Sequence, residues 1–97
     1  MAEIIWSPRA TNDFVEIIEY IAQDSEYYAK IFAQGVIKSI EVLGSFPESG
    51  RVVPEFRDPT IREIIHKPCR IVYRLNKHET LVEIARVWHS ARGIPEV

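Results

Sequence analysis

Residues 70–88 read RIVYRLNKHETLVEIARVW, and this stretch decides the fold. Its two ends are rich in β-branched and aromatic residues, and the polar segment Asn-Lys-His-Glu at 76–79 lies between them. Such runs on either side of a short polar segment predict a hairpin, with strands at 70–75 and 81–88. A run of the same character at 61–65 precedes them. The sequence therefore predicts an antiparallel sheet of three consecutive strands.

The middle strand has two different faces. Apolar residues alternate with arginines along it: Ile71, Tyr73 and Leu75 share one face, and Arg70, Val72 and Arg74 share the other. Successive side chains of a strand point to opposite sides of the sheet. We expect helices to cover the first face and the arginine face to be open.

Two helices are predicted before this sheet, after a short strand at 4–6. Ser7-Pro8 is typical of a helix N-cap followed by proline at the first helical position. The first helix has an apolar stripe at spacings of three and four, formed by Ala10, Phe14, Ile17, Ile18 and Ile21. After a new cap at Asp24-Ser25, a second stripe comprises Tyr28, Phe32, Val36, Ile40 and Leu43, and this helix ends at Gly44. The short connection predicts an antiparallel helical hairpin.

Residues 45–60 contain Pro47, Gly50, Pro54 and Pro59 and are predicted to form a loop. The 97 residues, with neither a repeat nor a linker, predict a single domain spanning 1–97. Its order is β-α-α-β-β-β, an α+β fold whose amino-terminal helical hairpin packs on one face of an antiparallel sheet.

Composition argues against several classes of protein. No apolar run approaches the length of a membrane span, and no apolar signal segment begins the chain, so we expect a cytoplasmic protein. Gly-rich phosphate loops, Cys-x-x-Cys and His-Glu-x-x-His are absent, and the three histidines have no ligand-like spacing. We therefore expect neither a cofactor nor a metal. The lone Cys69 is expected to be a small buried hydrophobe.

Charge is unevenly distributed along the chain, whose net charge is −2. Residues 1–50 hold three basic and eight acidic side chains, whereas residues 51–97 hold nine basic and six acidic ones. The second half would thus offer a positive surface to an acidic peptide segment or a nucleic-acid backbone. The alternative is that these arginines pair with neighbouring carboxylates on a solvated face.

Several charged residues of the second half are candidates for a site. The candidates are the strand arginines and their neighbours, namely Arg62, Arg70, Arg74, Arg86, Arg92, His89 and Glu55. Guanidinium groups bind phosphate and carboxylate in a bidentate way, so such a set would suit RNA or an acidic peptide. A structural ion pair is an equally open interpretation for each arginine.

His89 is the sharpest single candidate, because histidine exchanges protons close to neutral pH. Cleavage of RNA without a metal requires a base, an acid and cations that stabilise the charged phosphorane. Glu55, His89, Arg70 and Arg92 would fill those roles. The competing interpretation is a histidine that ends a strand and is hydrogen-bonded to backbone.

Four blocks of the sequence resemble the RelE/ParE toxin superfamily in their order and spacing. They are FPESGRVVPE at 46–55, IREI at 61–64, RIVYR at 70–74 and VWHSAR at 87–92. The start WSPRA at 6–10, followed by a helix that contains Asp13 and Ile17, is similar as well. The resemblance covers nearly the whole chain.

This resemblance implies the toxin of a bacterial type II toxin–antitoxin pair. Such a toxin inhibits growth and, in some systems, stabilises plasmids, and an antitoxin encoded by the adjacent gene neutralises it in a hetero-oligomer. The flexible segment of the antitoxin wraps the toxin. Arg62, Arg74 and Arg86 would bind either this antitoxin or the target of the toxin. A relative that keeps the fold and has lost the activity is a further alternative.

Two mechanisms occur in the superfamily: inhibition of DNA gyrase by ParE-like members, and ribosome-dependent cleavage of messenger RNA by RelE-like endoribonucleases. In one nuclease subgroup a loop Glu, a strand Arg and a carboxy-terminal His followed by Tyr carry the cleavage. Glu55, Arg70 and His89 match the first three, but Ser90 stands where the tyrosine would be. With a pI near 5.9 as well, we expect the ParE-like mechanism ahead of the nuclease.

Overall fold

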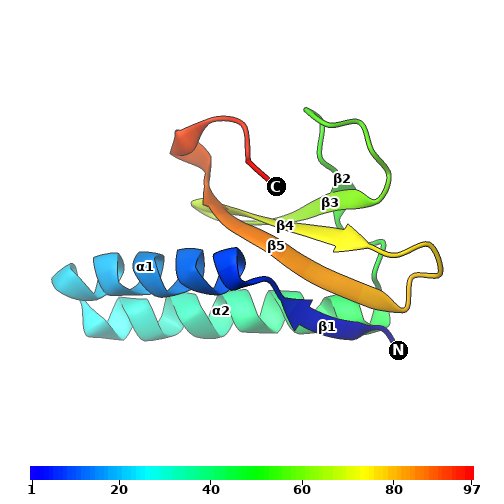
Figure 1. The fold of residues 1–97 in the computed structure, drawn as a ribbon. Coiled ribbons are helices and arrows are strands. Elements are labelled where there is room, and N and C mark those ends of the chain that lie inside the picture. Colours follow the sequence, from blue (N-terminus) through cyan, green and yellow to red (C-terminus); the bar gives the residue numbers. More distant parts are fainter.

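The computed structural model describes all residues 1–97. Its two helices lie on one side of a five-stranded sheet (Figure 1). In chain order the elements are β1 (Glu3–Trp6), α1 (Pro8–Asp24), α2 (Glu26–Ser45), β2 (Arg51–Val52), β3 (Ile61–His66), β4 (Cys69–Leu75), β5 (Leu81–His89) and the 3₁₀ helix η1 (Ser90–Arg92). The predicted α+β class and the helical hairpin are confirmed.

Both helices begin at the predicted caps. The Ala10 amide donates to Ser7 Oγ at 3.0 Å, and the Tyr28 amide donates to Ser25 Oγ at 3.1 Å. Each cap satisfies an amide that the first turn of a helix leaves free, a contribution of about 1 kcal/mol. Ser25 is also the residue that ends α1, so one residue separates the two helices and forces the hairpin.

The strands lie in the order β1-β5-β4-β3-β2. Strands β3, β4 and β5 pair antiparallel as predicted. Strand β2 joins them, also antiparallel, whereas β1 pairs with β5 in parallel, so the sheet is mixed. The loop predicted over 45–60 also contains β2, two residues that pair with β3. A strand of two residues is too short to show an alternation of apolar and polar residues in the sequence.

A β-bulge interrupts the pairing of β4 with β5. Val72 lies opposite Arg86 and Tyr73 lies opposite Ile84, so Ala85 has no counterpart. Strict alternation would put Arg86 on the same face as Ile84. The extra residue moves Arg86 to the other face and keeps Val87 in the core.

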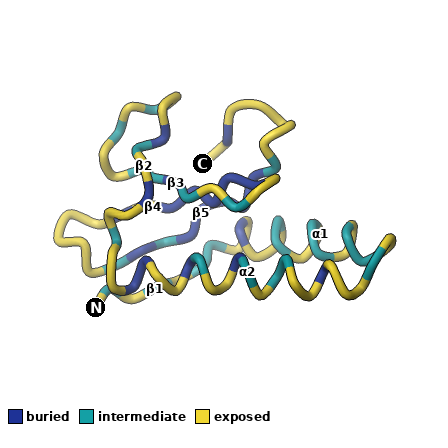
Figure 2. Tube along the Cα trace, turned by 180° about the vertical axis from the view of Figure 1, so that it is seen from behind, coloured by how far each residue is buried: buried dark blue, intermediate teal, exposed yellow.

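The core lies between the helices and the sheet. Val36, Ile40 and Leu43 of α2 pack on Ile71, Tyr73, Leu75, Val82, Ile84 and Val87 of the two central strands, and Cys69 is buried with them. Figure 2 shows the buried residues gathered in β4 and β5 and the exposed ones along the outer side of the helices. The predicted apolar face of the middle strand is confirmed.

The second helical stripe is only partly buried. Tyr28 was predicted to belong to it but is 66% exposed, because the tip of the hairpin extends beyond the sheet (Figure 1). Phe32 is half-buried and packs against the core, and the stripe from Val36 onward is fully covered. Periodicity identifies the face of a helix, but not how far the sheet reaches along it.

Tyr73 fixes the segment that leads into β2. Its hydroxyl donates to the Pro47 carbonyl at 2.7 Å and accepts from the Gly50 amide at 3.0 Å. A Cβ atom at Gly50 would lie 2.6 Å from both the Tyr73 hydroxyl and the Glu63 carbonyl oxygen. Only glycine fits this close approach.

Candidate functional site

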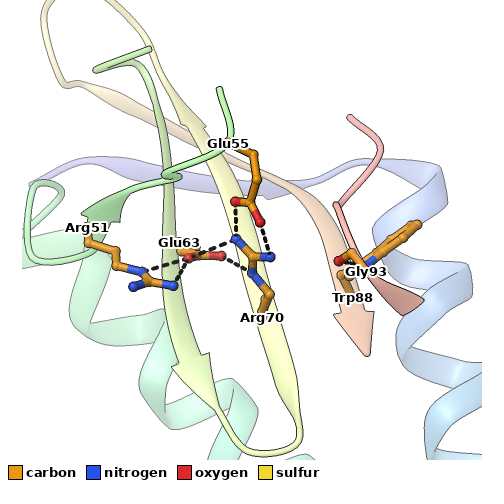
Figure 3. A network of polar contacts seen from close by, with 6 residues as sticks. All are labelled: Arg51, Glu55, Glu63, Arg70, Trp88 and Gly93. Carbon is orange, nitrogen blue, oxygen red and sulfur yellow. Dashed lines mark hydrogen bonds and ion pairs between the residues drawn. The ribbon is translucent and has the colours of Figure 1, made fainter. Parts of the chain in front are cut away.

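The face of the sheet away from the helices carries a cluster of four charged side chains. Arg70 lies at its centre and is bound by two carboxylates (Figure 3). Its Nη1 and Nη2 donate to Glu55 at 2.9 and 2.7 Å, and its Nε donates to Glu63 at 2.6 Å. Arg51 reaches the far side of Glu63, with its Nε and Nη2 both 2.7 Å from Oε2. Two guanidinium groups thus neutralise two carboxylates.

The neighbouring elements bring these four residues together. The register of β2, β3 and β4 places Arg51 opposite Glu63 and Glu63 opposite Val72, beside Arg70. The segment after β2 carries Glu55 over the sheet. Glu63 is 1% exposed, so its carboxylate depends on both guanidinium groups for compensation. The arginine face that we expected to be open is covered here.

The electrostatics of the cluster affect Glu55 most clearly. Hydrogen bonds from Arg70 lower the pKa of Glu55 from 4.5 to about 2. The hydrogen bonds that Arg70 donates to Glu55 and then to Glu63 raise the pKa of Arg70 further above its already high value. A carboxylate held so firmly in the ionised form is a weak acceptor for a substrate proton.

A second ion pair joins the sheet to α1. Arg86 donates from Nε and Nη2 to both carboxylate oxygens of Asp13, at 2.7 and 2.9 Å. The Val87 amide donates to the same carboxylate at 3.1 Å. Strand β1 pairs with β5 only as far as Ile84, so Asp13 provides an acceptor on the edge that β1 leaves free. The hydrogen bonds that Arg86 donates to Asp13 raise the pKa of Arg86.

The chain after β5 folds back over Trp88. The Trp88 indole Nε1 donates to the Gly93 carbonyl at 3.1 Å, and Arg86 donates to the Glu96 carbonyl at 3.1 Å. The guanidinium carbons of Arg92 and Arg86 lie 4.1 and 4.8 Å from the centre of the indole ring. Trp88 is therefore 2% exposed, and Arg92 stacks on it while remaining open to solvent.

His89 lies on the opposite face from Arg70. It pairs with the core residue Cys69, whereas Arg70 pairs with Trp88, and neighbouring positions of a strand point to opposite faces. The His89 Nδ1 accepts a hydrogen bond from the Ala91 amide at 3.1 Å, which begins η1. The structure therefore brings Glu55 and Arg70 together but separates them from His89.

Arg62 and Arg74 have different surroundings. Arg62 donates to the carbonyls of Pro59 and Gly50, both at 3.0 Å, and so holds the loop around it. Glu63, its neighbour in the chain, binds Arg51 and Arg70 and not Arg62. Arg74 makes an exposed ion pair with Glu83 at 3.3 Å. Of the arginines proposed for binding, Arg86 is buried, Arg62 is half-buried and Arg74 is exposed.

A pocket that the sequence did not suggest lies where α1 crosses the end of β5. Its volume is about 290 Å³, and it is lined by Asp13, Glu16, Ile17, Tyr20, Ile21, Pro68, Val87, His89 and Arg92. The signal in the sequence was the mixture of apolar and acidic residues on one side of the first helix. Nothing local indicated that His89 would face it.

No group of three or more His, Cys, Asp or Glu side chains is placed to hold a metal ion. Neither helix combines the length and the apolar character that crossing a membrane requires.

Comparison with known proteins gives concordant results. A family model described as the ParE toxin of the type II toxin–antitoxin system parDE matches residues 4–94. Toxin RelE2 of Caulobacter vibrioides is 33% identical over 92 residues, which are 95% of this chain and 99% of the relative. A chain of a solved structure entitled "Chromosomal ParDE TA system from P. aeruginosa" superposes with a TM-score of 0.73 at 18% identity, over 92% of this chain and 96% of that one.

Proposed function

Because this chain belongs to the ParE toxin family of type II toxin–antitoxin systems, we propose that it inhibits bacterial growth by binding DNA gyrase. A cognate antitoxin from the adjacent gene silences it in a hetero-oligomer. The solved ParDE structure with the same fold supports a partner of this kind. On this proposal the toxin acts through its surface and needs no reaction of its own.

The observation that carries this proposal is the closed ion cluster around Arg70. Metal-free cleavage of RNA needs a proton acceptor, a proton donor and a cation converging on one phosphate. Here the acceptor candidate is Glu55 and the cation candidate is Arg70. Both terminal guanidinium nitrogens of Arg70, Nη1 and Nη2, donate hydrogen bonds to the Glu55 carboxylate. The donor candidate His89 points to the other side of the sheet. This arrangement favours a binding toxin over a nuclease.

A second candidate function is ribosome-dependent cleavage of messenger RNA. One observation favours it: the 33% identical relative carries the name RelE2. Under this alternative Glu55, Arg70, His89 and Arg92 are the catalytic set, and the cluster would have to open on the ribosome. His89→Gln would then abolish cleavage and leave folding intact.

The test is induced expression in a bacterial host, with and without the neighbouring gene, followed by two assays on purified toxin. We expect growth arrest that the neighbour relieves, and inhibition of gyrase-catalysed supercoiling that premixed antitoxin prevents. His89→Gln is the matched variant, and it should inhibit gyrase as the wild-type chain does.

Two other outcomes would contradict the proposal that the chain inhibits gyrase. Cut messages with normal supercoiling, and their loss in His89→Gln, would replace the proposal with the nuclease. Soluble toxin without growth arrest would indicate a relative that keeps the fold as an inactive binding module.

A further inference from the structure

The pocket between α1 and the end of β5 has an apolar floor and a charged rim. Ile17 and Ile21 of α1 and Val87 of β5 form the floor, and all three are at least partly buried. Tyr20 stands at its edge with 72% of its surface exposed. An aromatic side chain so exposed beside a concave apolar surface is a typical anchor point for a protein partner.

The rim on the α1 side is acidic and uncompensated. Glu16 lies four residues before Tyr20 and Asp24 lies four residues after it, which puts all three on one side of the helix. Neither carboxylate makes an ion pair, and the same is true of Glu19. The only basic residue of α1, Arg9, contacts Glu96 at the other end of the helix. The apolar pocket thus lies against a negative helix surface.

We propose that this pocket binds an amphipathic segment of the antitoxin that carries lysine or arginine next to its apolar anchor residues. The inference rests on the proposed function for the identity of the partner. One large apolar side chain of the segment enters the pocket beside Tyr20. Basic side chains on its flanks lie over Glu16 and Asp24. Attraction between opposite charges sets the orientation of the segment and speeds its association.

Charge distinguishes this occupant from its competitors. A second copy of the chain would bring another acidic α1 against the first, and like charges at an interface oppose association. An acidic segment would meet the same repulsion. Arg51, Arg70 and Arg86 do not attract it either, because they are bound to carboxylates within the molecule. Arg92, the arginine that lines the pocket, is stacked on the indole ring of Trp88.

The experiment measures the affinity of the purified chain for the protein encoded by the adjacent gene, by calorimetry at two salt concentrations. Tyr20→Ala is expected to weaken binding by about tenfold or more, as truncation of a tyrosine anchor does. Glu16→Lys is expected to weaken it by about tenfold at low salt and less at high salt, because salt screens the lost attraction.

Two matched controls keep the test specific. Tyr27→Ala removes an aromatic side chain that is 71% exposed but lies outside the pocket. Glu41→Lys makes the same charge change on α2, outside the pocket. Both should bind the partner with the affinity of the wild-type chain, and circular dichroism should show that all four variants fold.

The outcomes separate this inference from the proposed function. If the wild-type chain binds its partner and both pocket variants bind it with the same affinity, the pocket is not the binding site, and the toxin–antitoxin proposal still stands. Absence of binding by the wild-type chain would overturn both. Toxin that binds its partner through the pocket but does not inhibit supercoiling would overturn gyrase as the target and support the pocket. A self-associating chain that Tyr20→Ala renders monomeric, at unchanged partner affinity, would assign the pocket to a second copy.

Discussion

The ion cluster on the sheet contains four charged side chains and α1 contains four carboxylates, but the two regions differ in how these charges are paired. On the sheet, Arg51 and Arg70 are bound to Glu55 and Glu63, so opposite charges cancel within a few ångströms. On α1, three of the four carboxylates have no cationic partner. Of these two regions, α1 is therefore the one that offers unpaired charge to a partner.

Folding decides between the two interpretations of the uneven charge along the chain. The second half of the chain holds most of the basic residues, but ion pairs and backbone carbonyls occupy Arg51, Arg62, Arg70 and Arg86. The alternative of internal pairing is the one that the structure shows for them. Available charge depends on which groups are left unpaired after folding, and net charge does not report it.

The largest effect is expected from breaking the cluster at its centre. Arg70→Met removes the main partner of the buried Glu63 and should lower the free energy of unfolding by about 3 kcal/mol, because an uncompensated buried charge is costly. Urea denaturation measures it. The nuclease hypothesis expects instead a fully stable variant that has lost cleavage, so a stability change below about 1 kcal/mol would contradict the structural role.

A smaller loss is expected where α1 meets β5. Asp13→Ala leaves Arg86 without its carboxylate and the Val87 amide without its acceptor, so we expect a loss of about 2 kcal/mol. The urea midpoint should fall with an unchanged slope. Asp13→Asn is the control, since it keeps one acceptor oxygen and should lose less. Equal stability of the alanine variant and the wild-type chain would contradict this prediction, because it would mean that water satisfies Arg86 and the Val87 amide as well as Asp13 does.

The pH dependence of stability should report Glu55. Its pKa is lowered from 4.5 to about 2, so its contribution is present above about pH 4.5 and is lost as pH falls through the folded-state pKa. Glu55→Gln should cost about 1 kcal/mol near neutral pH, because the pair is only partly buried. The difference between the two proteins should shrink progressively from pH 4.5 toward pH 2. A difference that stays constant over this range would mean that Arg70 does not hold this carboxylate in solution.

The smallest effects are expected at exposed charges. Arg74→Met breaks an exposed ion pair with Glu83, and Glu19→Gln removes a carboxylate that has no partner. Both should change the free energy of unfolding by less than about 0.5 kcal/mol. Thermal denaturation in low and high salt would measure this. A loss of free energy of unfolding well above this value in either variant would contradict the distinction between the paired and the exposed charges.

Much of the fold could be predicted from local sequence. Ser7-Pro8 and Ser25 determine where the helices begin through hydrogen bonds that span three residues. The alternation of Ile71, Tyr73 and Leu75 identifies the buried face, because side chains of a strand alternate whatever surrounds it. The two-residue β2 and the parallel pairing of β1 had no such signal, because each depends on a partner far away in the chain.

The candidate site was predicted less well. Glu55 and Arg70, two of the candidates, contact each other, but His89 lies on the opposite face of the sheet. The β-bulge at Ala85 and the core position of Cys69 decide which way the end of β5 points. The pocket beside Tyr20 could not be predicted from the sequence, because its lining residues come from α1 and from positions near 89, which are far apart in the chain.

The sequence by itself determined the identity and order of most elements, the caps of both helices and the buried face of the central strand. These features follow from interactions within a few residues, where the periods of helix and strand apply. Tertiary structure alone decided which charges cancel. Arg86 meets Asp13 across 73 positions and Arg70 meets Glu55 across 15, and no local pattern encodes such pairs. Only the register of the sheet and the placement of α1 bring their atoms within hydrogen-bonding distance.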